Sequence, residues 1–174
     1  MDLNYAIVGD NIYKKYKGFT LDIPQLTIPQ GFATALIGEN GAGKTTLMNI
    51  LAGIRLDYKG ELRYFGAYSD KDRENKPEVK EQIGYTGPGS YYLPQWKIKQ
   101  VESVSELLFS NFHKERFEHW LNELSVGADS NYLGKKVNSL SDGNRMKLMI
   151  AGVLARDTKM LLMDEPASPL DPLM

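Results

Sequence analysis

The 174-residue sequence contains no cysteine, which excludes both a disulfide framework and a metal site built on thiolates. It also lacks an excess of positive charge, because its 21 lysines and arginines are balanced in number by 22 aspartates and glutamates. Composition therefore gives no support for a nucleic-acid partner. Long apolar runs are missing as well: the longest, residues 148–155, is too short to cross a bilayer. If the protein works at a membrane, another chain is expected to supply the spanning part.

Histidine is scarce too. The chain holds only His113 and His119, both on or beside expected helices. Solvated surface is a better interpretation of these two side chains than a catalytic base or a metal ligand. The remaining composition, 42% apolar and 25% charged, is that of an ordinary globular protein with one α/β core.

One glycine-rich stretch fits the pattern G-x-x-x-x-G-K-[ST] without a gap. Its glycines allow backbone conformations in which consecutive N–H groups converge on a polyphosphate. Lys44 is expected to reach the β- and γ-phosphate oxygens, and the Thr45 hydroxyl to ligate Mg²⁺. The nine residues predicted to cradle the phosphates are Gly38, Glu39, Asn40, Gly41, Ala42, Gly43, Lys44, Thr45 and Thr46.

The flanking residues strengthen this prediction. Residues 32–37 read as a buried strand that runs into the loop, and residues 45–52 as an amphipathic helix that leaves it, capped by Gly53. Such a helix would point its unpaired amides and the positive end of its dipole at the phosphates. A glycine-rich turn that binds nothing is the alternative, and the strand–loop–helix context makes it a minor one.

The N-terminal part predicts two antiparallel strands, the first over residues 5–8 and 10–13 and the second over residues 21–28. Pro24 limits the second strand to a sheet edge or a bulge. Tyr16 is expected on a loop between them, where its ring could stack on a purine. From spacing alone, the possibility that Tyr16 or Phe19 merely covers the sheet is equally good.

A short strand over residues 81–86 is followed by a change to helical periodicity. One helix face is predicted from Val101, Val104, Leu107 and Leu108, and a second from Phe117, Trp120, Leu121 and Leu124. These two amphipathic segments predict a helical lobe inserted after the first half of the chain.

The C-terminal part predicts a helix with Ser141 as its N-cap, and then a buried strand over residues 159–163. That strand delivers Asp164 and Glu165 at its carboxyl end, where open α/β sheets place their sites. Asp164 can hold Mg²⁺, and Glu165 can orient or deprotonate an attacking water. In a chain that also carries a phosphate-binding loop, this acidic pair predicts catalysis.

Taken in order, these motifs resemble those of the ATP-binding cassette (ABC) ATPases over essentially all 174 residues. Residues 38–46 are similar to the Walker A loop, 160–165 to Walker B, 140–144 to the signature L-S-G-G-Q, and 168–171 to the D-loop. The resemblance implies an α/β P-loop core with a mainly parallel sheet, an antiparallel β-subdomain and a helical subdomain. Residues 1–86 and 156–174 are expected to form the core with its antiparallel part, and residues 87–155 the helical subdomain with the signature.

The resemblance also implies an activity, namely ATP hydrolysis with Mg²⁺ in a transporter subunit at the cytoplasmic face of the membrane. Glu165 and Lys44 are the implied catalytic residues, Thr45 and Asp164 the Mg²⁺ ligands, and Tyr16 the adenine-stacking aromatic. The implied partners are a second ATPase subunit, identical or different, and a polytopic membrane subunit. Ser141 and Gly143 would then meet the γ-phosphate held by the other ATPase subunit.

Three features depart from the family pattern. The signature carries Asp142 and Asn144 in place of Gly and Gln, and a carboxylate there should weaken triphosphate binding unless Arg145 or Lys147 offsets it. The position of the expected Q-loop glutamine holds Pro88, and Gln95 comes several residues later. The chain also ends before the family's switch histidine, which suggests a truncated subunit with an exposed sheet edge. A soluble relative that meets no membrane, and a regulatory module with weak or no turnover, remain the alternatives.

Overall fold

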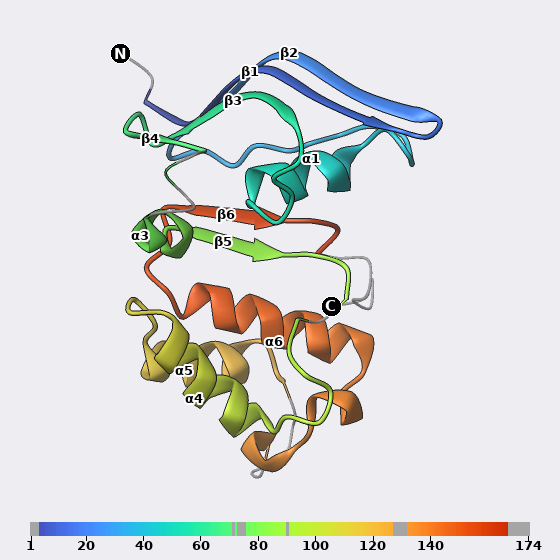
Figure 1. Ribbon diagram of the computed structural model, residues 1–174. Helices are drawn as coiled ribbons and strands as arrows, with labels where there is room; N and C mark the ends of the chain where they lie inside the picture. The colour runs from blue at the N-terminus through green and yellow to red at the C-terminus, as the bar shows by residue number, and fades with distance from the viewer. Residues whose placement is uncertain (1–3, 71, 73–75, 90, 127–131, 167–174) are drawn as a thin grey trace. The chain divides into compact units, whose positions relative to one another are not determined.

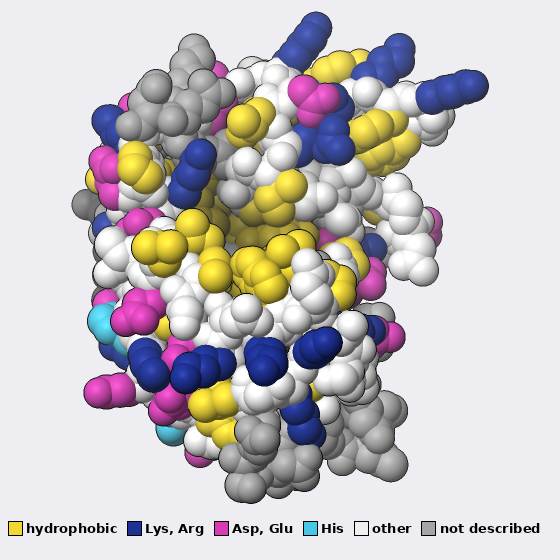
Figure 2. All heavy atoms as spheres, turned by 60° about the horizontal axis from the view of Figure 1, so that its bottom comes forward, with side chains coloured by type: hydrophobic (Ala, Val, Ile, Leu, Met, Phe, Trp, Pro, Cys, Tyr) yellow, Lys and Arg dark blue, Asp and Glu magenta, His cyan; other side chains and the backbone are white. Residues whose placement is uncertain are grey.

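The computed structural model describes residues 4–70, 72, 76–89, 91–126 and 132–166. The chain divides into two compact units, Met1–Ile83 and Gly84–Met174 (Figure 1). Within the described residues, no helix is long and apolar enough to span a membrane. Acidic and basic side chains both appear on the face shown in Figure 2, in keeping with the nearly balanced composition.

The first unit is built on an antiparallel sheet with the strand order β2-β1-β3-β4. Its strands are β1 (Tyr5–Tyr16), β2 (Phe19–Pro29), β3 (Lys59–Tyr64) and β4 (Tyr68–Ser69). The predicted antiparallel pairing of the first two strands is confirmed. β2 lies at the edge of the sheet. Pro24 has no backbone N–H, and an edge strand tolerates this because no strand on its outer side needs that hydrogen bond.

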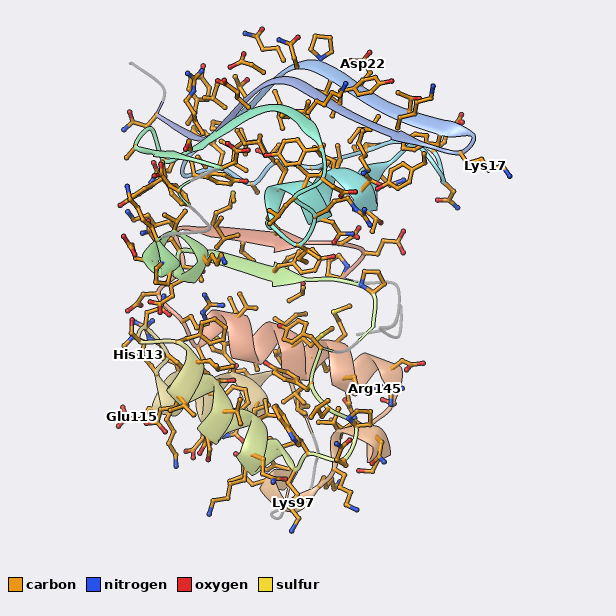
Figure 3. The ribbon with its side chains drawn as sticks, in the orientation of Figure 1. Lys17, Asp22, Lys97, His113, Glu115 and Arg145 are labelled. Carbon is orange, nitrogen blue, oxygen red and sulfur yellow. The ribbon has the colours of Figure 1, made fainter. Side chains whose placement is uncertain are left out.

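The hairpin between β1 and β2 is tighter than the sequence suggested. Tyr16 pairs with Phe19, and only Lys17 and Gly18 form the turn at the tip (Figure 3 labels Lys17). Gly18 has a φ of 95°, which glycine adopts without a steric penalty. The prediction that Tyr16 lies on a loop is therefore wrong: it is the last residue of β1, because a two-residue turn lets strand pairing continue to the tip.

Helix α1 (Lys44–Leu51) packs against this sheet through Leu47, Ile50 and Leu51. The Tyr64 hydroxyl donates a hydrogen bond to the Leu51 carbonyl over 3.1 Å and ties the end of the helix to β3. Gly53 follows with a φ of 74°, as expected for a glycine just past a helix end. The predicted helix is thus confirmed to within one residue at each end. The short helix α3 (Pro77–Glu81) buries Val79.

The predicted buried strand before the glycine-rich loop is not found. Residues 33–39 belong to no strand, and Phe32 and Ile37 are 67% and 90% exposed. An apolar segment becomes a buried strand only where neighbouring strands supply ladder bonds and a covering layer. Neither sheet formed by the described residues includes this segment.

The second unit contains β6 (Met160–Met163) and all but the first residue of β5 (Ile83–Thr86). The two strands lie side by side and run in the same direction (Figure 1). Helix α6 (Asp142–Leu154) covers them closely, since a Cβ added to Gly84 would lie 2.2 Å from Val153 Cγ1. A glycine is therefore required at this contact. The other elements of this unit are helices α4 (Ile98–Leu108) and α5 (Lys114–Glu123) and the 3₁₀ turns η1 (Tyr132–Gly134) and η2 (Val137–Ser139).

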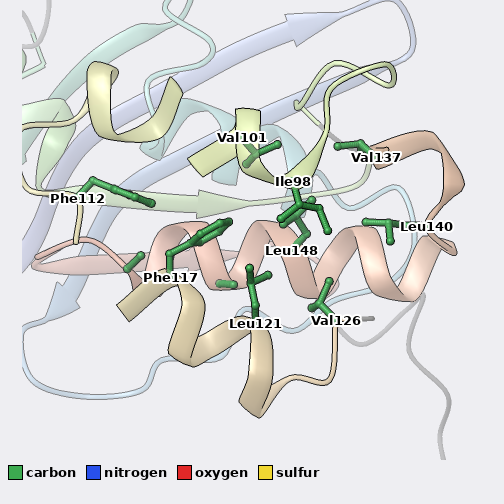
Figure 4. Packing of buried hydrophobic residues seen from close by; sticks show 11 residues of the cluster. Ile98, Val101, Phe112, Phe117, Leu121, Val126, Val137, Leu140 and Leu148 are labelled. Carbon is green, nitrogen blue, oxygen red and sulfur yellow. The ribbon is translucent and has the colours of Figure 1, made fainter. Parts of the chain in front are cut away.

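One apolar cluster joins the helices of this unit (Figure 4). Phe117 and Leu121 are buried as predicted, whereas the predicted face of α4 is wrong at its end. Leu107 and Leu108 are 84% and 64% exposed. Since α4 begins at Ile98, its buried face instead follows the i, i+3, i+4, i+7 series from that residue. The buried residues of this series are Ile98, Val101, Glu102 and Ser105.

Polar groups fix the start of α5 to the segment between α6 and β6. His113 Nε2 lies 2.7 Å from Asp157 Oδ2, and Arg116 Nη1 lies 2.5 Å from Asp157 Oδ1 (Figure 3 labels His113). The side-chain amide of Asn111 also donates a hydrogen bond from Nδ2 to the Asp157 carbonyl over 3.1 Å. His113 thus has a structural contact at an exposed position. Hydrogen bonding from His113 and from Arg116 holds the pKa of Asp157 below its usual value of 3.8.

A depressed carboxyl pKa stabilises the folded state above the ordinary pKa, and this stabilisation disappears as the pH falls through the lowered value. We therefore expect Asp157→Asn to lower the melting temperature at pH 7 and the difference from wild type to shrink below about pH 4. Melting curves followed by circular dichroism across pH 3–8 measure this. Asp22→Asn, at an exposed position of β2 (labelled in Figure 3), is the control. An equal effect of both variants would contradict the role assigned to Asp157.

Candidate nucleotide-binding site

The glycine-rich loop has the backbone conformation that its sequence predicts. Gly41 and Gly43 have φ values of 84° and 93°, in the left-handed region that side chains disfavour. The Ala42 amide donates to the Glu39 carbonyl over 3.2 Å, which closes a tight turn within the loop. Gly43 then serves as the N-cap of α1, so the loop leads directly into the first turn of the helix.

Lys44 turns back across the loop that precedes it. Its Nζ donates to the carbonyl oxygens of Gly38 and Glu39, each over 2.8 Å. The ammonium group is thereby held at the mouth of the loop, in the place where a polyphosphate would meet it. Thr45 and Thr46 lie in the first turn of α1, whose leading amides have no partner within the helix.

Tyr16 belongs to the same unit as the loop and is linked to it through Phe19. The two rings are stacked with their centroids 6.2 Å apart. A Cβ on Gly43 would lie 2.5 Å from Phe19 Cζ, so the phenylalanine ring lies directly on the backbone of the loop. The hairpin tip therefore brings an aromatic pair to the edge of the phosphate cradle.

In the second unit, the acidic pair follows β6 as predicted. Asp164 is only 4% exposed, and its Oδ2 has no hydrogen-bond partner among the residues that the structure describes. The Asp164 amide donates to the Thr86 carbonyl over 2.8 Å, which places the carboxylate at the carboxyl end of the β5–β6 pair. Burial, with a contribution from the Asp164 charge, raises the pKa of the Tyr85 hydroxyl. Glu165 is exposed and has a φ of 49°, an uncommon conformation for a residue with a side chain.

The signature segment forms a capped helix start. The Asn144 amide donates to Ser141 Oγ over 3.2 Å, and Gly143 lies in the first turn of α6. Arg145 forms an ion pair with Asp142 (Figure 3 labels Arg145). The expected compensation of the Asp142 charge is therefore present, and it comes from Arg145.

These groups fit Mg²⁺ and a triphosphate by their chemistry. A buried carboxylate oxygen without a partner is costly unless a cation or water satisfies it, and Mg²⁺ favours carboxylate and hydroxyl oxygens. The described residues contain no cluster of three acidic or histidine side chains, so such an ion would depend on the phosphates for part of its ligand set. The predicted D-loop, residues 168–171, lies outside the described residues.

Gln95, the one candidate to replace the missing glutamine, lies in a turn anchored to the segment before α6. The Asn138 amide donates to the Pro94 carbonyl, and the Val137 amide to the Trp96 carbonyl, each over 2.9 Å. Both neighbours of Gln95 are therefore fixed by backbone bonds, which limits how far its side chain can travel.

The structure adds residues that the sequence interpretation passed over. Asp57, to which the sequence analysis gives no role, forms ion pairs with Lys14 and Arg55. Both cations lie near the Tyr16 ring. No local signal reveals this cluster, because its members come from β1 and from the segment after α1.

Gly43 offers a direct test of the loop. An alanine there would have to adopt a left-handed conformation and would also place its Cβ against Phe19, so we expect Gly43→Ala to abolish detectable binding of a nucleoside triphosphate. Gly31→Ala is the matched control, because Gly31 has a φ of 81° but nothing within 4 Å of an added Cβ. It should lower stability by about 1 kcal/mol and leave binding intact. Isothermal titration and thermal melting of both variants measure the difference, and equal losses of binding would contradict this interpretation.

Comparison with known proteins agrees with this geometry. Residues 21–168 match a family model described as ABC transporter. The chain is 34% identical over 169 residues to the tungstate uptake system ATP-binding protein of Peptoclostridium acidaminophilum, and covers 74% of it with 95% of its own residues. It is 30% identical over 156 residues to an energy-coupling factor transporter ATP-binding protein of Streptococcus pneumoniae, where the match spans 85% of this chain but only 54% of the relative.

Among solved structures, cbiO1 from Clostridium perfringens, part of the ABC transporter complex cbiONQ, has a TM-score of 0.69 and 25% identity. That likeness covers 98% of this chain and 69% of the other. The predicted α/β cassette fold is therefore confirmed. The family match and the relatives at 30% identity or more show that the chain belongs to the ABC transporter family, as an ATP-binding subunit.

Proposed function

We propose that this chain binds Mg²⁺-ATP at the glycine-rich loop and hydrolyses it to drive a membrane transport system. The observation that carries the proposal is the position of the Lys44 ammonium, which two loop carbonyls hold at the mouth of a left-handed glycine turn. The chemistry of the ammonium suits the β- and γ-phosphate oxygens of a nucleotide.

In this proposal each functional side chain has a separate task. The amides of the loop and of the first turn of α1 bind the phosphates, while Lys44 neutralises charge on them. Thr45 and Asp164 would hold Mg²⁺, which when bound shields the phosphate charge. Glu165, exposed at the end of β6, takes a proton from the attacking water. At the same time the water oxygen forms a bond to the γ-phosphorus, and the bond between the γ-phosphorus and the ADP oxygen breaks.

A second ATPase subunit, identical or different, would complete the site with its own signature helix. Ser141 caps that helix, and the amide of Gly143 lies in its first turn, where the positive end of the dipole favours an anion. The ion pair of Arg145 with Asp142 places a positive charge beside the carboxylate, which reduces the repulsion that a free carboxylate would exert on the γ-phosphate. The departure from the family signature is thus compatible with ATP held between two subunits.

A polytopic membrane subunit would receive the movement produced by ATP binding and release, which would place this chain at the cytoplasmic face of the membrane. The relatives support this part of the proposal, since one belongs to a tungstate uptake system and another to a transporter complex. The same relatives weigh against a soluble member of the superfamily that meets no membrane.

Glu165→Gln tests the catalytic assignment. We expect it to leave ATP affinity within about twofold of wild type and to lower the hydrolysis rate by roughly 10²- to 10⁴-fold, because it removes the general base but keeps the shape of the side chain. Phosphate release measures turnover, and titration of the same preparations measures ATP binding. Glu123→Gln, an exposed glutamate at the end of α5, is the matched control and should change neither quantity.

Equal and slow hydrolysis by wild type and Glu165→Gln, with ATP bound by both, would instead favour the regulatory module with little turnover. Lys44→Ala should lose ATP binding in either case. It therefore tests the phosphate cradle independently of catalysis.

A further inference from the structure

The register of the β5–β6 pair places Asp164 beside Gly87. The Asp164 amide donates to the Thr86 carbonyl over 2.8 Å, and in a parallel ladder a residue with this bond lies opposite the next residue of the partner strand. A second contact agrees with this register, because a Cβ added to Gly84 would lie 3.3 Å from Leu161 Cδ1, three residues earlier on both strands. The two positions are therefore neighbours across the ladder.

Tyr85 points to the same face of the two strands as Asp164. Gly84 lies against Val153 of α6. Because side chains alternate along a strand, Tyr85 and position 87 point to the opposite face, together with Asp164. Burial raises the pKa of the Tyr85 hydroxyl and the charge of Asp164 adds to the shift, as expected for two groups on one face.

Gly87 leaves room for the Tyr85 hydroxyl. A Cβ added to Gly87 would lie 2.1 Å from the hydroxyl oxygen and 2.6 Å from Cζ, so the phenol ring extends along the strand and its hydroxyl takes the place of a side chain at position 87. Neighbouring strands are about 4.8 Å apart. The hydroxyl thus lies beside the side chain of Asp164, within reach of one bridging water.

Asp164 needs a donor at this place. Its Oδ2 is buried and has no hydrogen-bond partner among the described residues, which is costly for a carboxylate oxygen. Thr86 points toward α6, and the side chains of Gly87 and Pro88 have no polar atom. Tyr85 is therefore the polar side chain that this end of β5 brings to the face of Asp164.

Packing alone is the simplest alternative for a tyrosine in a strand. A phenylalanine would cover the strands equally well and would avoid the cost of burying a hydroxyl. The hydroxyl is, however, the part of the side chain for which the missing Cβ of Gly87 makes room. A glycine and a hydroxyl are thus arranged together beside one buried carboxylate.

We propose that Tyr85 is a positioning residue of the Mg²⁺ site, whose hydroxyl holds the Asp164 carboxylate in its binding orientation through a shared water. The hydroxyl donates to the water, and the water donates to Asp164 Oδ2. A carboxylate has further lone pairs, so this bridge leaves room for the cation. The inference rests on the proposed function and deepens it, because it adds a residue to the site assigned to Thr45 and Asp164. Loss of the hydroxyl should therefore affect ATP binding only when Mg²⁺ is present.

Tyr85→Phe tests this role, because it removes the hydroxyl and keeps the ring. Dissociation constants of ATP are measured by isothermal titration of the full chain, once with Mg²⁺ and once with EDTA. We expect Tyr85→Phe to weaken ATP binding by about 3- to 10-fold with Mg²⁺ and by less than about twofold in EDTA.

Tyr132→Phe is the matched control. Tyr132 lies in η1, is also partly buried, and has a pKa raised by burial and by the charges of Glu118 and Glu102. It removes a hydroxyl of the same kind away from the β5–β6 pair, so both dissociation constants should stay unchanged.

Gly87→Ala provides a second test in which the hydroxyl is kept. The added Cβ would displace the hydroxyl from its place, so the same Mg²⁺-dependent loss is expected. A double-mutant cycle with Asp164→Asn shows whether Tyr85 acts through the carboxylate. If it does, Tyr85→Phe has no further effect on the Mg²⁺ dependence in the Asp164→Asn background. A loss that persists there would overturn the positioning role.

Two other results would also overturn it while the proposed function stands. Equal weakening by Tyr85→Phe with and without Mg²⁺ would mean that the hydroxyl supports the nucleotide or the fold. No change in either constant would mean that the side chain only covers the strands. Failure of wild type to bind ATP, with or without Mg²⁺, would instead refute the proposed function itself.

Discussion

Convergence of backbone polar groups on one point is the constraint on which this site depends. A phosphate cradle needs several N–H groups aimed inward and a cation at its mouth, and both demands fall on a loop of a few residues. Gly41 and Gly43 supply the left-handed conformations that the first demand requires, with φ values of 84° and 93°. The carbonyls of Gly38 and Glu39 meet the second by holding Lys44. Because the loop is fixed at its end by α1, whose apolar side packs on the antiparallel sheet, the cradle depends on the core of the first unit.

Features that the sequence could predict are those with local causes. The helix after the loop, the Ser141 cap and the strand before Asp164 each depend on side chains within one or two turns of the chain, and all three are found. The ion pair of Arg145 with Asp142 is also local, since residues three apart on a helix face each other. These contacts need no knowledge of the rest of the fold.

The features that the sequence predicts wrongly depend on contacts between distant parts of the chain. Residues 32–37 have the composition of a buried strand, but burial of a strand depends on neighbours that composition does not specify, and Ile37 is 90% exposed. The face of α4 was misjudged because its first buried residue, Ile98, precedes the expected start and shifts the periodic series. Glu102 is part of that buried face because Lys114 Nζ, 3.0 Å away on α5, balances its charge. A partner on another helix cannot be inferred from spacing within one.

Tyr16 shows how a side chain's surroundings depend on contacts that spacing does not reveal. Spacing alone predicts its ring equally well as a stacking surface or as a cover for the sheet, and only the family resemblance favours stacking on adenine. The hairpin register brings the ring against Phe19, and the absence of a side chain at Gly43 lets Phe19 lie on the loop. The same glycine therefore serves two purposes, since it allows the left-handed turn of the cradle and leaves room for the aromatic pair. A larger residue at that position would disturb the loop and the aromatic pair together, so under the proposed function phosphate and base recognition would be coupled through one missing Cβ.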